Sequence, residues 1–138
     1  MPRRTLVFSL AVMMCLMFWP TAAAGDPDCV RGEEKEARLA LGGLDPVLLV
    51  SGRTEAGKRA IRARHEGFSY RFYSDATRRA FQEEPDRYGI QLQGFCPVSP
   101  ELPGKSNIYL VHEGRIYLFF SEPCRETFRK NPKSFLPL

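Results

Sequence analysis

One segment of this chain occurs twice, and this duplication constrains the fold more than any other feature of the sequence. Residues 65–88 align with residues 112–135 without a gap at an offset of 47, and nine of the 24 positions are identical. Each copy begins with His-Glu-Gly and continues with alternating aromatic residues, a serine, a phenylalanine and a proline. Self-similarity at a fixed spacing is typical of one supersecondary unit that a chain uses more than once.

Each copy is predicted to begin with a β-hairpin. Its second strand alternates aromatic with other residues, and the Glu-Gly pair before that strand is a tight-turn signal because glycine readily adopts a positive φ. The expected strand, turn and strand cover residues 60–65, 66–67 and 68–72 in the first copy and residues 107–112, 113–114 and 115–119 in the second.

A helix is predicted to follow each hairpin. Ser74 and Ser121 occupy N-cap positions, and each is followed by an acidic residue that suits the positive end of a helix. The helices are expected over residues 75–84 and 122–130, where a proline shortly afterwards ends each one.

The two copies together predict an α+β fold. Phe81 and Phe128 lie one to two turns into the helices, so we expect their rings to pack on the aromatic residues of the strands. Each ββα unit has a half-covered sheet to bury, and we expect the two units to pack together with pseudo-two-fold symmetry. The first unit would span residues 44–90 and the second residues 91–138.

The first 24 residues have the layout of a secretory signal peptide. Arg3 and Arg4 precede an apolar run over residues 6–19, and Ala22 and Ala24 supply the small residues of an A-x-A cleavage site. The run is shorter than the roughly 20 residues of a membrane span. We therefore expect cleavage after Ala24 and export to a periplasm or the exterior. The mature chain would then have no stable membrane span. The alternative is an uncleaved membrane anchor.

The mature chain would begin with a leader over residues 25–43, in which residues 33–41 favour a short helix before Gly42-Gly43. Without the two arginines of the signal peptide, 18 basic and 16 acidic residues remain. This balance, with no basic stripe of interleaved aromatic residues, argues against nucleic acid as a partner.

The duplicated motifs resemble the YHS domain family, which is related to the TRASH metal-binding modules. The resemblance covers most of residues 42–136. It lies in three features that each occur twice: Gly-x-[Asp/Cys]-Pro-Val, then Glu-Gly-x-x-Tyr-x-Phe-x-Ser, and then a phenylalanine and a proline in and after the helix. It implies tandem treble-clef-like ββα units and a role in binding or sensing soft or heavy metals. It does not imply catalysis.

The resemblance also indicates where metal ligands would lie. Metal-binding members typically carry a cysteine near the first loop, another just before the strand-end serine, and a third in the first helical turn. In the second unit these positions hold Cys96, Phe120 and Cys124. The first unit has Asp45, Tyr73 and Thr77 instead, which implies a degenerate, structural copy.

Three hypotheses remain open for Cys96 and Cys124. A disulfide between them would close a loop of about 28 residues and contribute roughly 3 kcal/mol in the chain-entropy model, in the oxidising compartment expected of an exported protein. Alternatively, both thiolates bind a soft ion such as Cu(I) or zinc; the helix N-terminus favours the thiolate form of Cys124. They could also be two unrelated buried thiols.

A zinc site would need further ligands, because structural zinc usually takes four. Cys29 in the leader and His112 are the candidates for a third ligand. His112 has an equivalent, His65, in the cysteine-free copy, which favours a role at the hairpin end for both histidines.

The sequence carries no Gly-rich phosphate loop, HExxH or GxSxG motif, so we expect no enzymatic activity. The prediction is an exported module that binds or senses a soft metal ion. The alternative is a disulfide-stapled interaction or scaffold domain from which the metal role has been lost.

Overall fold

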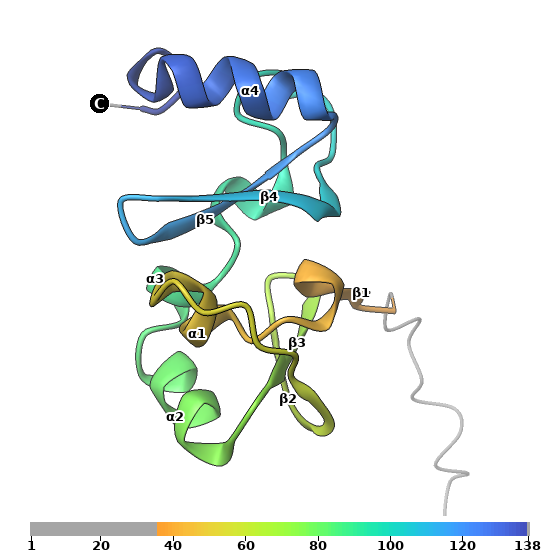
Figure 1. Ribbon diagram of the computed structural model, residues 1–138. Helices are drawn as coiled ribbons and strands as arrows, with labels where there is room; N and C mark the ends of the chain where they lie inside the picture. Colours follow the sequence, from red (N-terminus) through yellow and green to blue (C-terminus); the bar gives the residue numbers. More distant parts are fainter. Residues whose placement is uncertain (1–35, 138) are drawn as a thin grey trace, which may run out of the picture. The chain divides into compact units, whose positions relative to one another are not determined.

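Short strands and short helices alternate along residues 36–137, the part of the chain that the computed structural model describes (Figure 1). The predicted α+β class is confirmed. The predicted signal peptide, its cleavage site at Ala24, and Cys29 all lie outside the described residues. Among residues 36–137, no helix combines the length and the apolar character that a membrane crossing requires.

Both predicted hairpins are present, and each is followed by its helix. The first set comprises β2 (Lys58–His65), β3 (Phe68–Phe72) and α2 (Asp75–Glu83), and the second comprises β4 (Lys105–His112), β5 (Arg115–Phe119) and α4 (Glu122–Lys130). Both strand pairs are antiparallel, and the first strand of each begins two residues before the predicted start.

Local interactions fix the start of both helices as the sequence predicts. The Ser74 hydroxyl accepts a hydrogen bond from the Thr77 N–H at 3.3 Å, and the Ser121 hydroxyl accepts one from the Cys124 N–H at 3.4 Å. Each bond satisfies one of the main-chain donors that the first turn of a helix leaves without a partner.

The predicted helix over residues 33–41 is wrong for the described part, residues 36–41. Two of these residues form strand β1 (Arg38–Leu39), which pairs in parallel with β3, and the 3₁₀ segment η2 (Ala40–Gly43) follows. Leu41 has a φ of 55°, in the left-handed region that interrupts a helix. Pairing with β3 outweighs the local helix propensity.

A 3₁₀ segment with a left-handed leucine precedes each hairpin. After β1 and η2 comes the five-residue helix α1 (Pro46–Val50), and after α2 come α3 (Pro85–Tyr88) and the 3₁₀ segment η3 (Gln91–Gly94). A last 3₁₀ turn, η4 (Pro132–Ser134), follows α4. Like Leu41, Leu92 in η3 adopts a positive φ, 53°.

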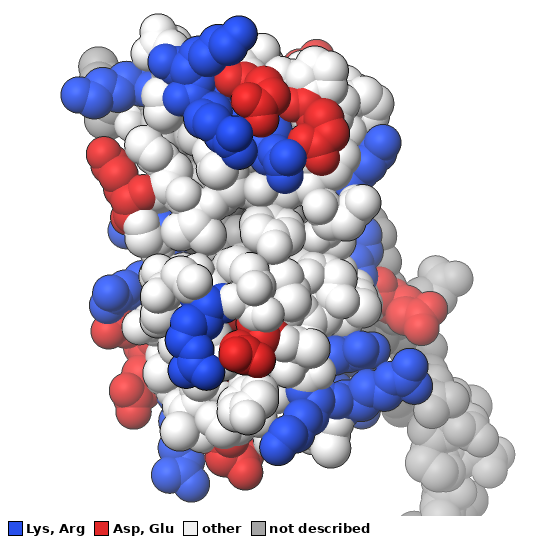
Figure 2. Space-filling view, viewed as in Figure 1, with Lys and Arg blue, Asp and Glu red and all other residues white. Residues whose placement is uncertain are grey.

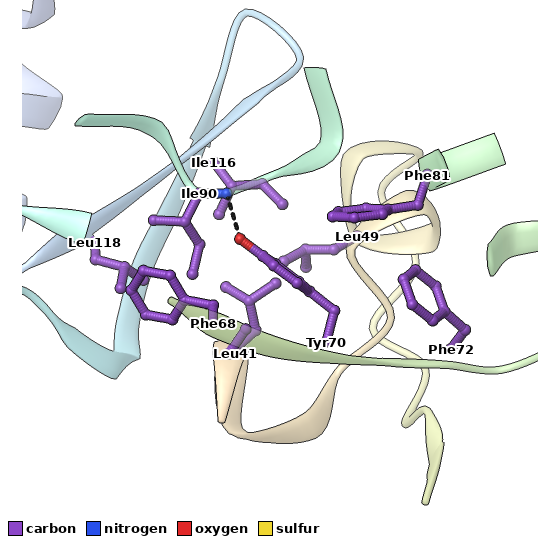
Figure 3. Close-up of a cluster of buried hydrophobic side chains, with 10 residues drawn as sticks. Leu41, Leu49, Phe68, Tyr70, Phe72, Phe81, Ile90, Ile116 and Leu118 are labelled. Atoms are coloured by element: carbon purple, nitrogen blue, oxygen red, sulfur yellow. Dashed lines mark hydrogen bonds between the residues drawn. The ribbon is translucent and has the colours of Figure 1, made fainter. Parts of the chain in front are cut away.

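The first hydrophobic cluster includes Phe81 of α2, which packs against the aromatic residues of β3 (Figure 3). The Phe81 ring lies 4.7 Å from the Tyr70 ring and 5.2 Å from the Phe72 ring, measured between centroids. The Tyr70 hydroxyl accepts a hydrogen bond from the Ile90 N–H at 2.9 Å, so this buried polar group has a partner. Aromatic packing of this kind was predicted from the spacing of the rings.

The second cluster repeats this arrangement around Phe128 of α4. Its ring lies 5.5 Å from Tyr117 and 5.2 Å from Phe119 between centroids. Cys96 is buried in the same cluster. The predicted core role of both helical phenylalanines is therefore confirmed.

Strand β5 contributes to both clusters, because its side chains alternate between two faces. Tyr117 and Phe119 lie in the second cluster, whereas Ile116 and Leu118 lie in the first, beside the residues of β3 (Figure 3). No equivalent exchange occurs in the other direction among the described residues. A two-fold interface would use the same surface of both halves. The contact between the two halves instead joins two different surfaces, head to tail. The expected pseudo-two-fold packing is therefore wrong.

Candidate functional site

The structure brings Cys96 and Cys124 together. Cys96 lies in the loop after η3 and is fully buried, whereas Cys124 lies in the first turn of α4 and is partly exposed. The two thiols are 4.1 Å apart and not bonded to each other. Residues separated by 28 positions in the sequence thus form one two-thiol site.

Main-chain hydrogen bonds hold the Cys96 loop against residues 102–104, which precede β4. The Cys96 N–H donates to the Leu102 carbonyl at 3.0 Å, and the Gly104 N–H donates to the Gly94 carbonyl at 2.7 Å. Gly94 has a φ of 81°, and a Cβ at this position would lie 2.5 Å from the Phe68 ring. A glycine is therefore required where the loop passes the first unit.

The environment of Cys124 favours its thiolate. The Ser121 hydroxyl donates a hydrogen bond to the Cys124 sulfur at 3.3 Å, and this bond is the main cause that lowers the pKa of the Cys124 thiol below its ordinary value. Partial burial opposes the shift, while hydrogen bonds with Cys96 and Ser99 add to it. A lowered pKa makes a cysteine more nucleophilic at neutral pH and a better metal ligand.

The position equivalent to Cys96 in the first unit holds a buried carboxylate. Asp45 is 0% exposed, and its two oxygens accept hydrogen bonds from three main-chain amides: those of Val47 at 2.9 Å, Leu48 at 3.2 Å and Tyr73 at 2.8 Å. It caps α1 and ties that helix to the end of β3. This position of the unit therefore accommodates a buried anion that main-chain donors satisfy.

Sequence reasoning treated Asp45 only as a lost ligand and missed this structural role. The signal that predicts it is local, because an aspartate followed by proline is a typical N-cap and first residue of a helix. Thr77, equivalent to Cys124, likewise has a capping role: its hydroxyl accepts a hydrogen bond from the Ser74 N–H at 3.3 Å. The first unit thus has oxygen atoms where the second has sulfur.

His112, the proposed third ligand, lies at the end of β4 and packs edge-on against Phe128, with ring centroids 5.7 Å apart. Its Nε2 atom is 3.8 Å from the Glu113 carboxylate. His65 packs in the same way against Phe81, at 6.0 Å. Within residues 36–137, no group of three His, Cys, Asp or Glu side chains is placed to hold a metal ion.

A shallow depression adjoins the buried thiol. Its volume is about 410 Å³, and its lining is mostly apolar: Leu92, Gln93, Phe95, Cys96, Pro97, Pro100 and Phe135. The Cys96 side therefore faces a surface hollow, while Cys124 reaches solvent at the helix end.

Comparison of the chain with protein-family models, with curated proteins and with solved structures finds no match.

A single metal ion fits between the two thiols. Zinc binds thiolate sulfur at about 2.3 Å, so one ion in contact with two sulfurs can span up to about 4.6 Å. The observed 4.1 Å lies within this limit. A disulfide has a sulfur–sulfur distance of about 2.05 Å, so its formation requires the two residues to approach by roughly 2 Å.

Proposed function

We propose that this chain is an exported binding protein with two tandem YHS-like units, of which the second binds one soft metal ion through Cys96 and Cys124. The observation that carries the proposal is the proximity of two unbonded thiols, 4.1 Å apart, one of which has a lowered pKa. The first unit has no thiol and serves as a structural copy.

Equivalent contacts support the tandem duplication. The Gly57 N–H donates to the Gly43 carbonyl at 2.8 Å, as the Gly104 N–H does to Gly94 at 2.7 Å. Isolated antiparallel bridges join Leu44 to Ala56 and Phe95 to Pro103 at corresponding places. These contacts lie outside the hairpins and helices, so the similarity extends to the segment before each hairpin.

The number of ligands favours Cu(I) over zinc. Structural zinc usually takes four protein ligands, and residues 36–137 supply two thiols without a third His, Cys, Asp or Glu. Soft thiolate ligands select Cu(I).

The second candidate is a disulfide-stapled interaction domain. The same proximity of the two cysteines favours it, and export would place the chain in an oxidising compartment. Catalysis by Cys124 is not proposed, because the side-chain hydrogen bonds of its sulfur involve Ser121, Ser99 and Cys96, and none of these is a histidine or carboxylate that could act as a general base.

Copper titration tests the proposal. The mature chain, reduced and kept without oxygen, is titrated with Cu(I) against a chromogenic Cu(I) chelator, and one ion per chain is expected. The matched variants are Cys96→Ala, which adds no polar group at this buried position, and Cys124→Thr, which introduces the residue of the first unit; both should keep the fold while losing the ion.

Two outcomes contradict the metal site. One is Cu(I) binding that the two variants leave unchanged while circular dichroism shows them folded. The other outcome concerns protein isolated without reductant: both thiols resist alkylation until reductant is added, and the protein contains no metal. This result supports the disulfide-stapled domain instead.

A further inference from the structure

The two units meet through one face of the second hairpin. Tyr109 pairs across the strands with Leu118, and Val111 pairs with Ile116, so all four side chains share one face of the sheet. Ile116 and Leu118 are buried in the first cluster, and the two β4 residues pack against it. We call these four residues the apolar hairpin face.

The apolar hairpin face covers a surface of the first unit that includes η2. Leu41 of η2 is 1% exposed and lies in the same cluster as Ile116 and Leu118 (Figure 3). Leu44 packs partly buried at the edge of this cluster. The first unit therefore depends on a neighbouring hairpin to bury its η2 side.

In the second unit, nothing among the described residues covers the equivalent surface. Leu92, equivalent to Leu41, is 39% exposed, and Phe95, equivalent to Leu44, is 42% exposed. Both line the 410 Å³ depression beside Cys96, together with Pro97, Pro100 and Phe135. We call this set the open surface.

The first hairpin could not fill the open surface of a second copy. The four positions of its equivalent face hold Arg62, Arg64, Ser69 and Arg71, with Arg62 opposite Arg71 and Arg64 opposite Ser69. Lys and Arg side chains gather over the region of β2 in Figure 2. Burying guanidinium groups against leucine and phenylalanine is unfavourable, so this face ends the stack of units instead of extending it.

We propose that the open surface docks a β-hairpin of another protein, one that presents four apolar side chains as the apolar hairpin face does. The precedent lies within the chain, because the equivalent surface of the first unit holds such a hairpin. When units pack head to tail without forming a closed ring, the last unit keeps an uncovered contact surface. Here that surface is the apolar open surface of the second unit. Since Cys96 lines the open surface, the docked hairpin covers the buried side of the two-thiol site.

An extended chain tests whether the open surface accepts a hairpin of this chemistry. Residues 92–138 are repeated after Leu138, which keeps the 47-residue period and offers a third unit. Phe95→Trp at the original position reports coverage, because the sequence has one tryptophan, Trp19, which lies before the predicted cleavage site. Relative to the unextended Phe95→Trp chain, we expect a blue shift in the emission of the introduced indole and at least a two-fold fall in its quenching by acrylamide.

The matched control carries Arg, Arg, Ser and Arg at the four apolar positions of the added hairpin, as in the first unit, and should leave the emission unchanged. The proposal is overturned if the extended chain shows no shift while circular dichroism shows that the added unit is folded. It is also overturned if the control shifts equally, or if the unextended chain shifts with concentration, since that indicates a second copy as the occupant.

Discussion

Removal of the Asp45 carboxylate is predicted to destabilise the protein more than removal of any exposed acid. In Asp45→Ala, helix α1 loses its cap, which costs about 1 kcal/mol. The Tyr73 N–H also loses the acceptor that lies 2.8 Å away, and an unsatisfied donor in a partly buried place costs about 2 kcal/mol. The expected loss in the free energy of unfolding is therefore about 3 kcal/mol.

The two oxygens of Asp45 have separate tasks, so Asp45→Asn gives an intermediate prediction. One oxygen accepts from Val47 and Leu48, and the other accepts from Tyr73. An asparagine keeps one acceptor oxygen and presents an NH₂ group in place of the other. The amide would retain the helix cap but place a donor against the Tyr73 N–H, so a loss of about 2 kcal/mol is expected.

Urea unfolding followed by circular dichroism measures these losses, and thermal unfolding checks them. For a domain of this size, a loss of about 3 kcal/mol corresponds to a fall of roughly 15 °C in Tm. The control is Asp75→Ala, because the Asp75 side chain is 60% exposed and its ion pair with Arg78 contributes less than about 1 kcal/mol. Equal losses for Asp45→Ala and Asp75→Ala would refute the structural role of the buried carboxylate.

Three further predictions concern the clusters and the thiol. Burial raises the pKa of Tyr70 to about 12 from an ordinary 10. The neutral phenol therefore stabilises the fold below pH 10, and roughly 3 kcal/mol of this stability is lost as the pH rises through 12. Denaturant unfolding at a series of pH values should show that the free energy of unfolding falls less steeply above pH 10 in Tyr70→Phe than in the wild type. Phe128→Ala should cost about 3–5 kcal/mol in urea unfolding, and a cost below about 1 kcal/mol would contradict its central position. In Ser121→Ala, the pH midpoint of Cys124 alkylation should rise, because the hydroxyl that donates to the thiolate is gone; a midpoint unchanged from wild type would show that Ser121 does not cause the shift.

The hairpins, the helices and the aromatic core could be predicted from the sequence because local signals specify them. The alternation of Phe68, Tyr70 and Phe72 sets the buried face of β3, and the serine caps fix where α2 and α4 begin. The turns add one detail that the pattern did not give: Glu66 adopts a φ of 46°, so the residue before the glycine is left-handed as well.

The features that the sequence did not predict depend on contacts between distant residues. β1 exists because β3 offers a parallel edge, and a short helix was the better local prediction for the same residues. The direction of packing between the units is also non-local, since it follows from which hairpin face is apolar. The contrast between Arg71 and Leu118 at equivalent positions carries that information, whereas the identities shared by the two copies do not.

The candidate site was predictable in part. The resemblance paired Cys96 with Cys124 as the outer two ligand positions, and the structure places these thiols side by side. It did not predict that Ser121 would donate to the sulfur. That contact depends on the side-chain torsions of a capping serine, which a sequence motif does not specify.

The two units show how one architecture can support different chemistry at the same position. In the first, a carboxylate held by main-chain amides joins a helix to a strand, which is a structural use of a buried anion. In the second, the residues after Cys96 form no helix that requires a cap, so this position is released from that structural task. A thiol at this position therefore costs no helix cap, and under the proposed function the second thiol of the metal-binding pair is Cys124, 28 residues later in the first turn of α4. Under the proposed function, the position that stabilises the first copy is therefore the position that binds the ion in the second.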